Sequence, residues 1–299
     1  MKVLLFGKNG QVGWELQRAL APIAALVAVD RDDTNPACGD LTDVDRLLAT
    51  VRHVRPDVIV NAAAYTAVDK AESEPELARA INATGPAALA QAAAECGAWL
   101  LHYSTDYVFN GAGSKPWTED DATGPLNVYG QTKLEGEQLI RASGCLHLIL
   151  RTSWVYASRG HNFARTMLRL AAERDQLTII DDQHGAPTGA DLLADVTAHS
   201  LLAAMKEPDL GGTYHVTASG ETTWYGYARR VVETARAAGQ PIFVTPDAIR
   251  PVASTVFSTA AVRPLNSRLD TSRFRKSFGL ELPHWTAGVD RMLAEILGC

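Results

Sequence analysis

The sequence predicts an α/β protein in which a doubly wound parallel sheet is followed by a smaller C-terminal α/β lobe. Short apolar runs of strand length alternate with segments of helical periodicity, and a glycine-rich turn at residues 7–13 follows the first run. The alternation loosens beyond Asp181. A chain of 299 residues suits about two average domains. We expect the sheet domain to span 1–155, plus roughly 156–185, and the lobe to span roughly 186–299.

Composition and charge exclude several classes of protein. The hydrophobic fraction of 46% and charged fraction of 21% are those of a globular chain. The net charge of -6 is spread along the chain, which argues against nucleic acid as a partner, and no apolar run reaches membrane-spanning length. The cysteines lack the spacing of a zinc site or a disulfide framework, so we expect a cytoplasmic protein; they are Cys38, Cys96, Cys145 and Cys299.

The N-terminal unit reads as strand, glycine turn, helix and second strand. Residues 2–6 form the first apolar run, and the helix continues through Leu16 and Leu20. Gly7, Gly10 and Gly13 would let the backbone turn tightly and approach a pyrophosphate, as in a Rossmann fold, although their spacing is looser than G-x-G-x-x-G.

The second strand, 26–29, ends in an acidic residue. Asp30 lies about 20 residues beyond the glycine turn, where an acid binds the hydroxyls of the adenosine ribose. Arg31 could instead accept a 2′-phosphate. Both NADH and NADPH therefore remain open as cofactors.

The alternation continues through the middle of the chain. A helix is expected over 44–54, a third strand over 56–60, and a helix over 71–96 that is interrupted around Gly85 and Pro86. The fourth strand, 99–103, delivers Ser104, Thr105 and Asp106 at its carboxyl end. In an open parallel sheet, ligands bind at that end.

Tyr129 and Lys133 stand four residues apart at the start of an amphipathic segment, so on a helix their side chains project from one face. A tyrosine normally titrates near about 10, and a cation held close to it lowers that pKa towards neutrality. Such a phenol acts as a general acid or base. The Thr105 hydroxyl could meet Tyr129 over a substrate oxygen.

The remaining chain completes the sheet and forms the lobe. Residues 107–128 make a loop of the length typical of lids and binding loops. A fifth strand at 146–150, a helix at 162–173 and a sixth strand at 177–180 are expected to complete the sheet. We take the rest as a substrate lobe, with a helix at 191–205, a strand at 213–217 and a terminal helix at 285–297.

Taken together, Gly7, Gly10, Gly13, Asp30, Thr105, Tyr129 and Lys133 resemble the extended short-chain dehydrogenase/reductase superfamily, whose catalytic triad is Ser/Thr, Tyr and Lys. Within it, further motifs resemble the dTDP-4-dehydrorhamnose reductase family over essentially the whole chain. These are Gly10-Gln11-Val12-Gly13, Thr105-Asp106-Tyr107-Val108-Phe109, Arg151-Thr152-Ser153-Trp154-Val155-Tyr156, Asp182-Gln183-His184-Gly185-Ala186-Pro187-Thr188 and Arg263-Pro264-Leu265-Asn266-Ser267.

The resemblance implies a reaction and the residues for it. The family reduces the C4 ketone of dTDP-4-dehydro-L-rhamnose with NADPH or NADH, in the last step of dTDP-rhamnose biosynthesis, which supplies cell-surface polysaccharide. Tyr129 would protonate the alkoxide, Lys133 would lower the pKa of Tyr129 and hold the nicotinamide ribose, and Thr105 would stabilise the oxyanion. Residues expected to line the dinucleotide are Gly7, Gly10, Gln11, Val12, Gly13, Asp30, Asp40, Leu41, Ala64, Tyr65, Thr66, Tyr103, Tyr129 and Lys133. Those expected to face the sugar are Thr105, Asp106, Tyr129 and Trp154.

The resemblance also implies a homodimer that binds Mg²⁺ through Glu15, Asp191 and Glu295, since oxygen ligands suit this ion. Asp191 departs from the family, where a longer Glu is common. Two alternative functions remain open. One is a nucleotide-sugar epimerase or dehydratase of the same superfamily, for which Asp106 beside the catalytic hydroxyl is the relevant feature. The other is a regulatory subunit without turnover, against which the intact Tyr129 and Lys133 argue.

Overall fold

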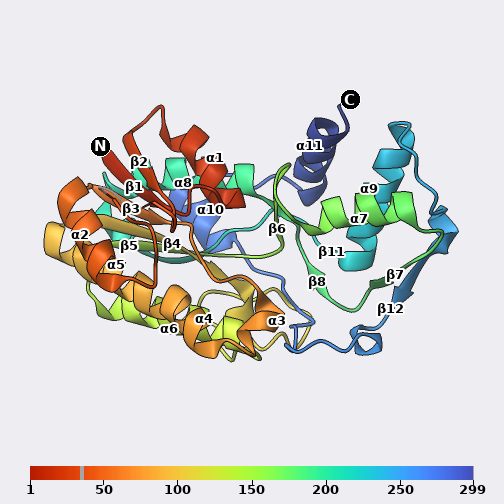
Figure 1. The fold of residues 1–299 in the computed structure, drawn as a ribbon, viewed down its shortest axis with the longest axis horizontal. Helices are drawn as coiled ribbons and strands as arrows, with labels where there is room; N and C mark the ends of the chain where they lie inside the picture. The colour runs from red at the N-terminus through yellow and green to blue at the C-terminus, as the bar shows by residue number, and fades with distance from the viewer. Residues whose placement is uncertain (34–36, 299) are drawn as a thin grey trace.

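A six-stranded parallel sheet forms the centre of the molecule (Figure 1). The structure is a computed structural model and describes residues 1–33 and 37–298. The strands lie in the order β10-β5-β4-β3-β1-β2. They are β1 (Lys2–Phe6), β2 (Ala25–Val29), β3 (Val58–Asn61), β4 (Trp99–Thr105), β5 (His147–Thr152) and β10 (Gly212–His215). Five of them match strands expected from apolar runs, and the doubly wound prediction is confirmed.

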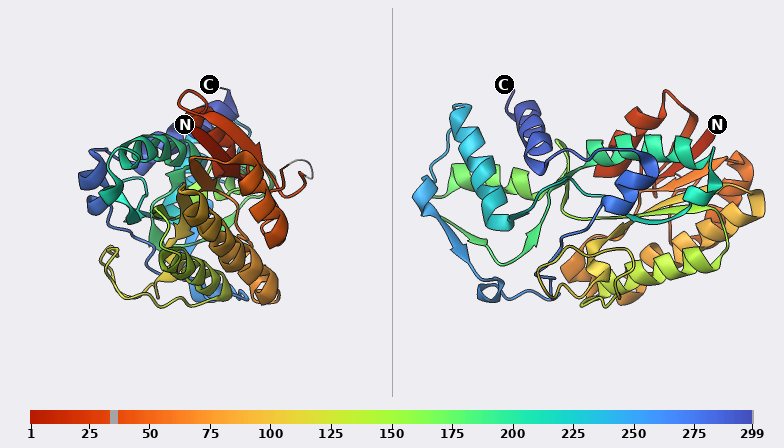
Figure 2. Two further views of the ribbon diagram at one scale, coloured as in Figure 1. Left: turned by 90° about the vertical axis from the view of Figure 1, so that its left-hand side faces the viewer. Right: turned by 180° about the vertical axis from the view of Figure 1, so that it is seen from behind.

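Helices cover both faces of this sheet (Figures 1 and 2). Alternate residues of β1 enter different cores, because successive side chains of a strand point to opposite faces. One face is covered by α1 (Gln11–Leu20), α8 (Ala190–Ala204) and α10 (Ser272–Phe278), and the other by α2 (Val44–Val54), α5 (Gly85–Cys96) and α6 (Val128–Ala142). Among the described helices, none has the length and apolarity needed to cross a membrane.

The sixth strand of the sheet is a correction to the sequence prediction. Residues 177–180 were expected there, but they form β7 (Leu177–Ile180), which pairs with β12 (Ile249–Val252) in a separate two-stranded sheet. The edge position belongs to β10, which pairs with β5 through the register Gly212↔Leu148 to His215↔Arg151. An apolar run indicates a buried strand, but which strand pairs with it depends on contacts between residues that are far apart in the sequence.

The smaller body, on the right in Figure 1, has its own apolar core around Tyr227. Its main elements are α7 (Phe163–Glu173), β7, α9 (Trp224–Ala237), β12 and α11 (Trp285–Leu297). Two further pairs of short strands are β6 (Val155–Tyr156) with β9 (Thr188–Gly189), and β8 (His184–Gly185) with β11 (Thr222–Thr223). Elements from both sides of residue 185 enter each core, so the two cores do not divide the chain at that residue. The expected domain division near residue 185 stays a prediction.

The strand order also fixes where a ligand can bind. From β1 the chain passes to β2 on one side and then to β3 on the other, so the connections leave in opposite directions between β1 and β3. Such a reversal opens a crevice at the carboxyl ends of the strands. The residues after β1, β3, β4 and β5 are brought together there.

Candidate active site

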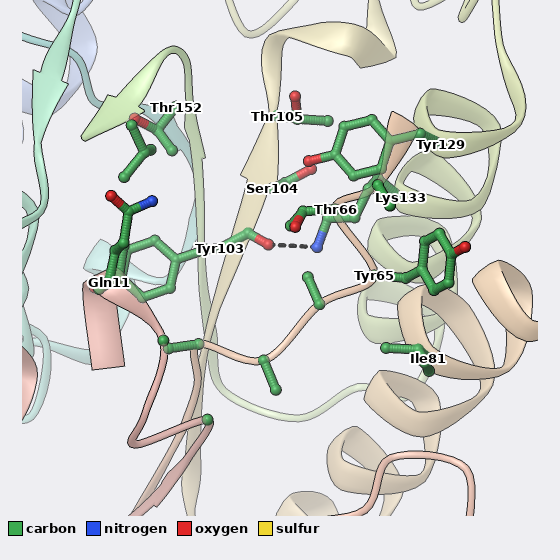
Figure 3. A pocket seen from close by; sticks show the side chains of 18 of the residues that line it. Gln11, Tyr65, Thr66, Ile81, Tyr103, Ser104, Thr105, Tyr129, Lys133 and Thr152 are labelled. Carbon is green, nitrogen blue, oxygen red and sulfur yellow. Dashed lines mark hydrogen bonds between the residues drawn. The ribbon is translucent and has the colours of Figure 1, made fainter. Parts of the chain in front are cut away.

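A cavity of about 740 Å³ lies at the carboxyl ends of the strands and is bounded on its far side by Trp224 of the smaller body. Figure 3 shows part of its lining. All but one of the predicted cofactor and sugar residues line it: Gly7, Gly10, Gln11, Val12, Asp30, Asp40, Leu41, Ala64, Tyr65, Thr66, Tyr103, Thr105, Asp106, Tyr129, Lys133 and Trp154. The remaining residue, Gly13, packs against Gly7 behind this surface.

The glycine turn is built for close approach of the main chain. Gly7 has φ +84°, and a Cβ on it would lie 2.8 Å from the main-chain nitrogen of Ala63. A Cβ on Gly13 would lie 2.0 Å from the carbonyl oxygen of Gly7. Helix α1 begins at Gln11 with Gly10 as N-cap, a residue without a side chain. The first N–H groups of α1 therefore suit an anion such as a pyrophosphate.

The end of β2 places a carboxylate at the edge of the same cavity. Asp30 accepts hydrogen bonds from the main-chain nitrogens of Asn9, at 3.1 Å, and Arg31, at 2.8 Å. These bonds fix the carboxylate beside the glycine turn. The position suits a ribose, and Arg31 in the same lining suits a 2′-phosphate.

The segment after β3 lines the cavity mainly with its backbone. The Tyr65 hydroxyl donates to Glu74 Oε2 at 2.7 Å, away from the other labelled side chains of Figure 3. Asn82 holds the segment from behind, since its Oδ1 accepts from Tyr65 N at 2.9 Å and its Nδ2 donates to Tyr65 O at 3.1 Å. Asn82 comes from a π-helical turn, Ala80–Thr84, between α4 (Pro75–Arg79) and α5. This turn is the interruption expected near Gly85.

Helix α6 presents Tyr129 and Lys133 along one face, as the four-residue spacing predicted (Figure 3), and Lys133 and Glu137 of this face bind β4 through Tyr103 O and Ser104 Oγ. The helix starts at Asn127, whose side chain accepts from Gly130 N at 2.8 Å. Gly130 permits close packing, because a Cβ there would lie 2.2 Å from the Tyr107 carbonyl oxygen. The three side chains consequently enter the protein instead of solvent.

The protonation of this pair differs from the sequence prediction. Tyr129 lines the cavity and is partly buried; removal of its phenol from bulk water raises its pKa to about 12, with a hydrogen bond to Thr105 acting in the opposite direction. The net shift is therefore upward, and the pKa near neutrality that the sequence predicted for Tyr129 is not found in this arrangement. Lys133 Nζ donates to Tyr103 O at 2.6 Å (Figure 3), and its burial lowers its own pKa to about 8. The phenol is therefore protonated at neutral pH.

Buried polar atoms converge from β4 and β5. Thr105 Oγ1 donates to Asp106 Oδ1 at 3.2 Å, and burial raises the pKa of Asp106 to about 7. Asp106 Oδ2, Thr152 Oγ1 and Ser153 Oγ find no hydrogen-bond partner among the described residues. Because a buried polar atom without a partner costs free energy, these three suit a polar ligand in the cavity.

Trp154 joins the two bodies across the cavity. Its ring stacks on that of Trp224 with centroids 3.8 Å apart. Its backbone has φ +50°, a conformation that bulky residues adopt only when the surrounding structure imposes it. The stacked pair forms an apolar part of the cavity wall.

Sequence reasoning missed the polar network behind the cavity. Glu137 is fully buried and accepts two hydrogen bonds from Arg151, at 2.9 and 2.7 Å, and one from Ser104 Oγ at 2.6 Å. Burial alone would raise the pKa of Glu137, but Arg151, Ser104 and Arg141 together outweigh it, and the pKa lies below the ordinary value. His102 contacts Lys133 from the same face of β4. The positions of Glu137, four residues after Lys133, and of Arg151, in a strand, were the available signals.

The predicted magnesium ligands do meet, but as an ion-pair cluster. Glu15, Asp191 and Glu295 line a small cavity of about 30 Å³ together with Arg291. Arg291 lies 3.5 Å from Asp191 and 3.4 Å from Glu295, while Arg18 lies 3.2 Å from Glu15. Within residues 1–33 and 37–298, no group of three or more acidic, His or Cys side chains is arranged to hold a metal ion. The Mg²⁺ expectation is unsupported, because arginines neutralise these carboxylates.

Known proteins resemble this chain over its whole length. The family model described as RmlD substrate binding domain matches residues 1–297. The dTDP-4-dehydrorhamnose reductase of Escherichia coli (strain K12) is 58% identical over 296 residues, covering 99% of this chain and 98% of that protein. The corresponding protein of Burkholderia thailandensis is 44% identical over 301 residues, covering 99% of each.

Solved structures agree with this likeness. A dTDP-4-dehydrorhamnose reductase from Clostridium acetobutylicum superposes with a TM-score of 0.88 at 35% identity, covering 100% of both chains. The Bacillus anthracis enzyme, solved in complex with NADP, gives 0.87 at 34% identity, covering 99% of this chain and 100% of that one.

Proposed function

The chain belongs to the RmlD substrate binding domain family, that of the dTDP-4-dehydrorhamnose reductases. From this premise we propose that it reduces dTDP-4-dehydro-L-rhamnose (dTDP-4-dehydro-6-deoxy-L-mannose) to dTDP-L-rhamnose. The reductant is NADPH or NADH. One observation carries the proposal: a single cavity has the glycine turn and Asp30 at one end and Thr105, Tyr129 and Lys133 at the other. A dinucleotide and a ketone would meet between these ends.

Tyr129 is the proton donor. When bound, the reduced dinucleotide supplies the hydride that the C4 carbon of the sugar accepts. The oxygen at C4 then takes the phenolic proton of Tyr129, which is available because the raised pKa keeps the phenol protonated. Thr105 stabilises the charge that develops on that oxygen through its hydroxyl.

Lys133 stabilises the phenolate that proton transfer leaves on Tyr129. As an ammonium ion it would lie in a site from which water is excluded, where a charge acts more strongly than in solvent. Gly7, Gly10 and the first turn of α1 hold the pyrophosphate, and Asp30 or Arg31 binds the adenosine ribose. The Bacillus anthracis relative was solved in complex with NADP, which supports a dinucleotide as the ligand.

Asp106 and Trp154 orient the sugar. Asp106 Oδ2 is a buried acceptor without a partner among the described residues, and it suits a sugar hydroxyl. The Trp154–Trp224 pair supplies the apolar surface on the opposite side. We assign the larger body to the dinucleotide and the smaller one to the sugar nucleotide.

The test is to incubate purified protein with dTDP-4-dehydro-L-rhamnose and each reduced dinucleotide in turn. The proposal requires one dinucleotide oxidised per sugar reduced, with dTDP-L-rhamnose as the product. An epimerase or dehydratase would recycle its dinucleotide, and a regulatory subunit would leave both compounds unchanged. Either outcome would overturn the proposal.

Location and assembly complete the proposal. The free thiols of Cys38, Cys96 and Cys145 favour a reducing compartment such as the cytoplasm. A homodimer is the expected assembly from the family resemblance, and sedimentation of the purified protein would test it.

A further inference from the structure

A fully buried histidine contacts Lys133, and the proposed reaction gives it no role. His102 lies in β4 opposite Asn61 of β3, with both side chains inside the protein. Its Nε2 lies 3.0 Å from Lys133 Nζ, and its Nδ1 lies 3.1 Å from Asn61 Nδ2. The three residues therefore form a continuous chain of hydrogen bonds that ends at the active site.

The backbone fixes the direction of these hydrogen bonds. Ala63 N donates to Asn61 Oδ1 at 3.1 Å, and a main-chain N–H can only donate. The other end of the amide, Nδ2, must then donate to His102 Nδ1, which makes Nδ1 an acceptor. A neutral imidazole carries one hydrogen, so it lies on Nε2 and points at Lys133.

This tautomer determines which form of Lys133 fits. An N–H on Nε2 needs a lone pair on Nζ, and only the uncharged amine has one. The amine can donate one of its hydrogens to Tyr103 O and still accept from His102. An ammonium group would instead direct an N–H against the imidazole N–H.

We propose that Asn61 and His102 are positioning residues that control the charge of Lys133. In the arrangement seen here they hold Lys133 as an amine, and its protonation requires the hydrogen on His102 to move to Nδ1 while the Asn61 amide turns over. The inference rests on the proposed function, because the charge of Lys133 matters only if Tyr129 becomes a phenolate.

The other titratable groups around Lys133 are consistent with a charge on Lys133 that changes near neutral pH. Burial lowers the pKa of Lys133 to about 8, while the charge of Glu137 on the same helix raises it. Burial and the proximity of Lys133 hold the pKa of His102 well below its ordinary value, so the ring is neutral. Tyr129, also on α6, is protonated and uncharged. The charge of Lys133 can thus change near neutral pH.

The direct test is the tautomer of His102 in the unmodified protein. Long-range ¹H–¹⁵N spectra of protein with ¹⁵N-labelled histidine distinguish hydrogen on Nε2 from hydrogen on Nδ1, and the spectrum of a His102→Gln variant identifies the resonance. In protein without added dinucleotide we expect Nε2–H above pH 8, where Lys133 is an amine, and a shift of the hydrogen to Nδ1 as Lys133 gains its charge below that pH, which the ¹³Cε shift of Lys133 reports. Hydrogen on Nδ1 above pH 8, or Lys133 charged well above that pH, overturns the proposal.

Two variants of Asn61 extend the test to turnover. In Asn61→Asp the carboxylate still accepts from Ala63 N but also accepts from Nδ1, which forces the opposite tautomer and favours the ammonium. The pKa at which kcat/KM falls on the alkaline side of its pH profile should rise by about one unit or more. Asn61→Leu removes the amide that selects the His102 tautomer without adding charge. Its alkaline pKa should therefore lie between those of the parent protein and of Asn61→Asp.

The pattern of the three proteins decides the result. An alkaline pKa of kcat/KM that is unchanged in Asn61→Asp overturns the proposal. A pKa that moves in Asn61→Asp but not in Asn61→Leu also overturns it, because the added charge alone would explain that shift. The His102 spectra of the same variants need no turnover. A protein with the Nε2–H tautomer that fails to reduce the dTDP-sugar would refute the proposed function and leave the Asn61–His102 relation intact.

Discussion

Two groups of polar and charged side chains have opposite environments in the molecule; the sequence predicted that Tyr129 and Lys133 of the first group, and all three carboxylates of the second, act together. The α6 group, Tyr129, Lys133 and Glu137, faces β4, and its members bind neighbours on β4 and β5. The acidic corner, Glu15, Asp191 and Glu295, lies at the surface with Arg18 and Arg291. The side chain of Glu137 is 0% exposed, whereas those of Asp191 and Glu295 are 29% and 50% exposed.

The difference shows that burial, and not the number of charges, determines how strongly a cluster affects stability and the pKa values of its members. Behind α6 each polar atom must find a partner in the protein, and the pKa values of Tyr129 and Lys133 are displaced by loss of water. In the acidic corner, solvent screens the same kinds of charge, and such pairs contribute little. The α6 group should therefore respond strongly to substitution and the corner weakly.

The largest effect is expected at the cavity end of the α6 group. Tyr129→Phe removes the proton donor while keeping the ring, so turnover should fall by roughly 10²–10⁴-fold, the usual contribution of a general acid. Affinity for the dinucleotide, measured by fluorescence titration, should be retained. Turnover equal to that of the parent protein would show that Tyr129 is not the acid.

A comparable effect, on folding, is expected at the buried end. Glu137→Gln leaves Arg151 buried without its counter-charge, which should lower the free energy of unfolding by about 3–5 kcal/mol in denaturant titrations. Adding Arg151→Met to this variant is the matched control, and it should restore part of the loss. A loss below about 1 kcal/mol would mean that the pair is screened like a surface pair.

The same pair sets a pH dependence. The folded protein holds the pKa of Glu137 below its ordinary 4.5, so the pair stabilises the fold above that pH. This stability is lost as the pH falls below 4.5 and through the lowered pKa. The stability difference between parent and Glu137→Gln should narrow over that acidic range, and a constant difference would contradict the assignment.

A smaller effect is expected at Asp30, which is only partly buried. Asp30→Ala removes a charged hydrogen-bond acceptor for the ribose, so the affinity for NADH should fall by roughly tenfold. NADPH should lose less, because Arg31 beside it suits the 2′-phosphate. Equal losses for both dinucleotides in binding titrations would reject the ribose assignment.

The smallest effect is expected in the acidic corner. Asp191→Asn should change the free energy of unfolding by less than about 0.5 kcal/mol, since the Arg291 contact is exposed and 3.5 Å long. Addition of Mg²⁺ or a chelator should leave the thermal midpoint unchanged. A midpoint that rises with Mg²⁺ only when Asp191 is present would overturn our interpretation of the corner.

The sequence by itself determined the sheet and most of the cavity. Apolar strand-length runs, the spacing of Gly7, Gly10 and Gly13, and the polar residues after each strand are local patterns, and the carboxyl ends of parallel strands share one edge. The four-residue spacing likewise determined that Tyr129 and Lys133 share a helical face.

Only the tertiary structure decided which partners these residues meet and how much water remains around them. It paired β10 instead of β7 with β5, set arginines among the predicted metal ligands, raised the pKa of Tyr129 and placed His102 against Lys133. The reason is physical: pairing and solvation depend on contacts between residues that are distant in the chain, such as Asn61, His102 and Lys133, and a local pattern does not contain them.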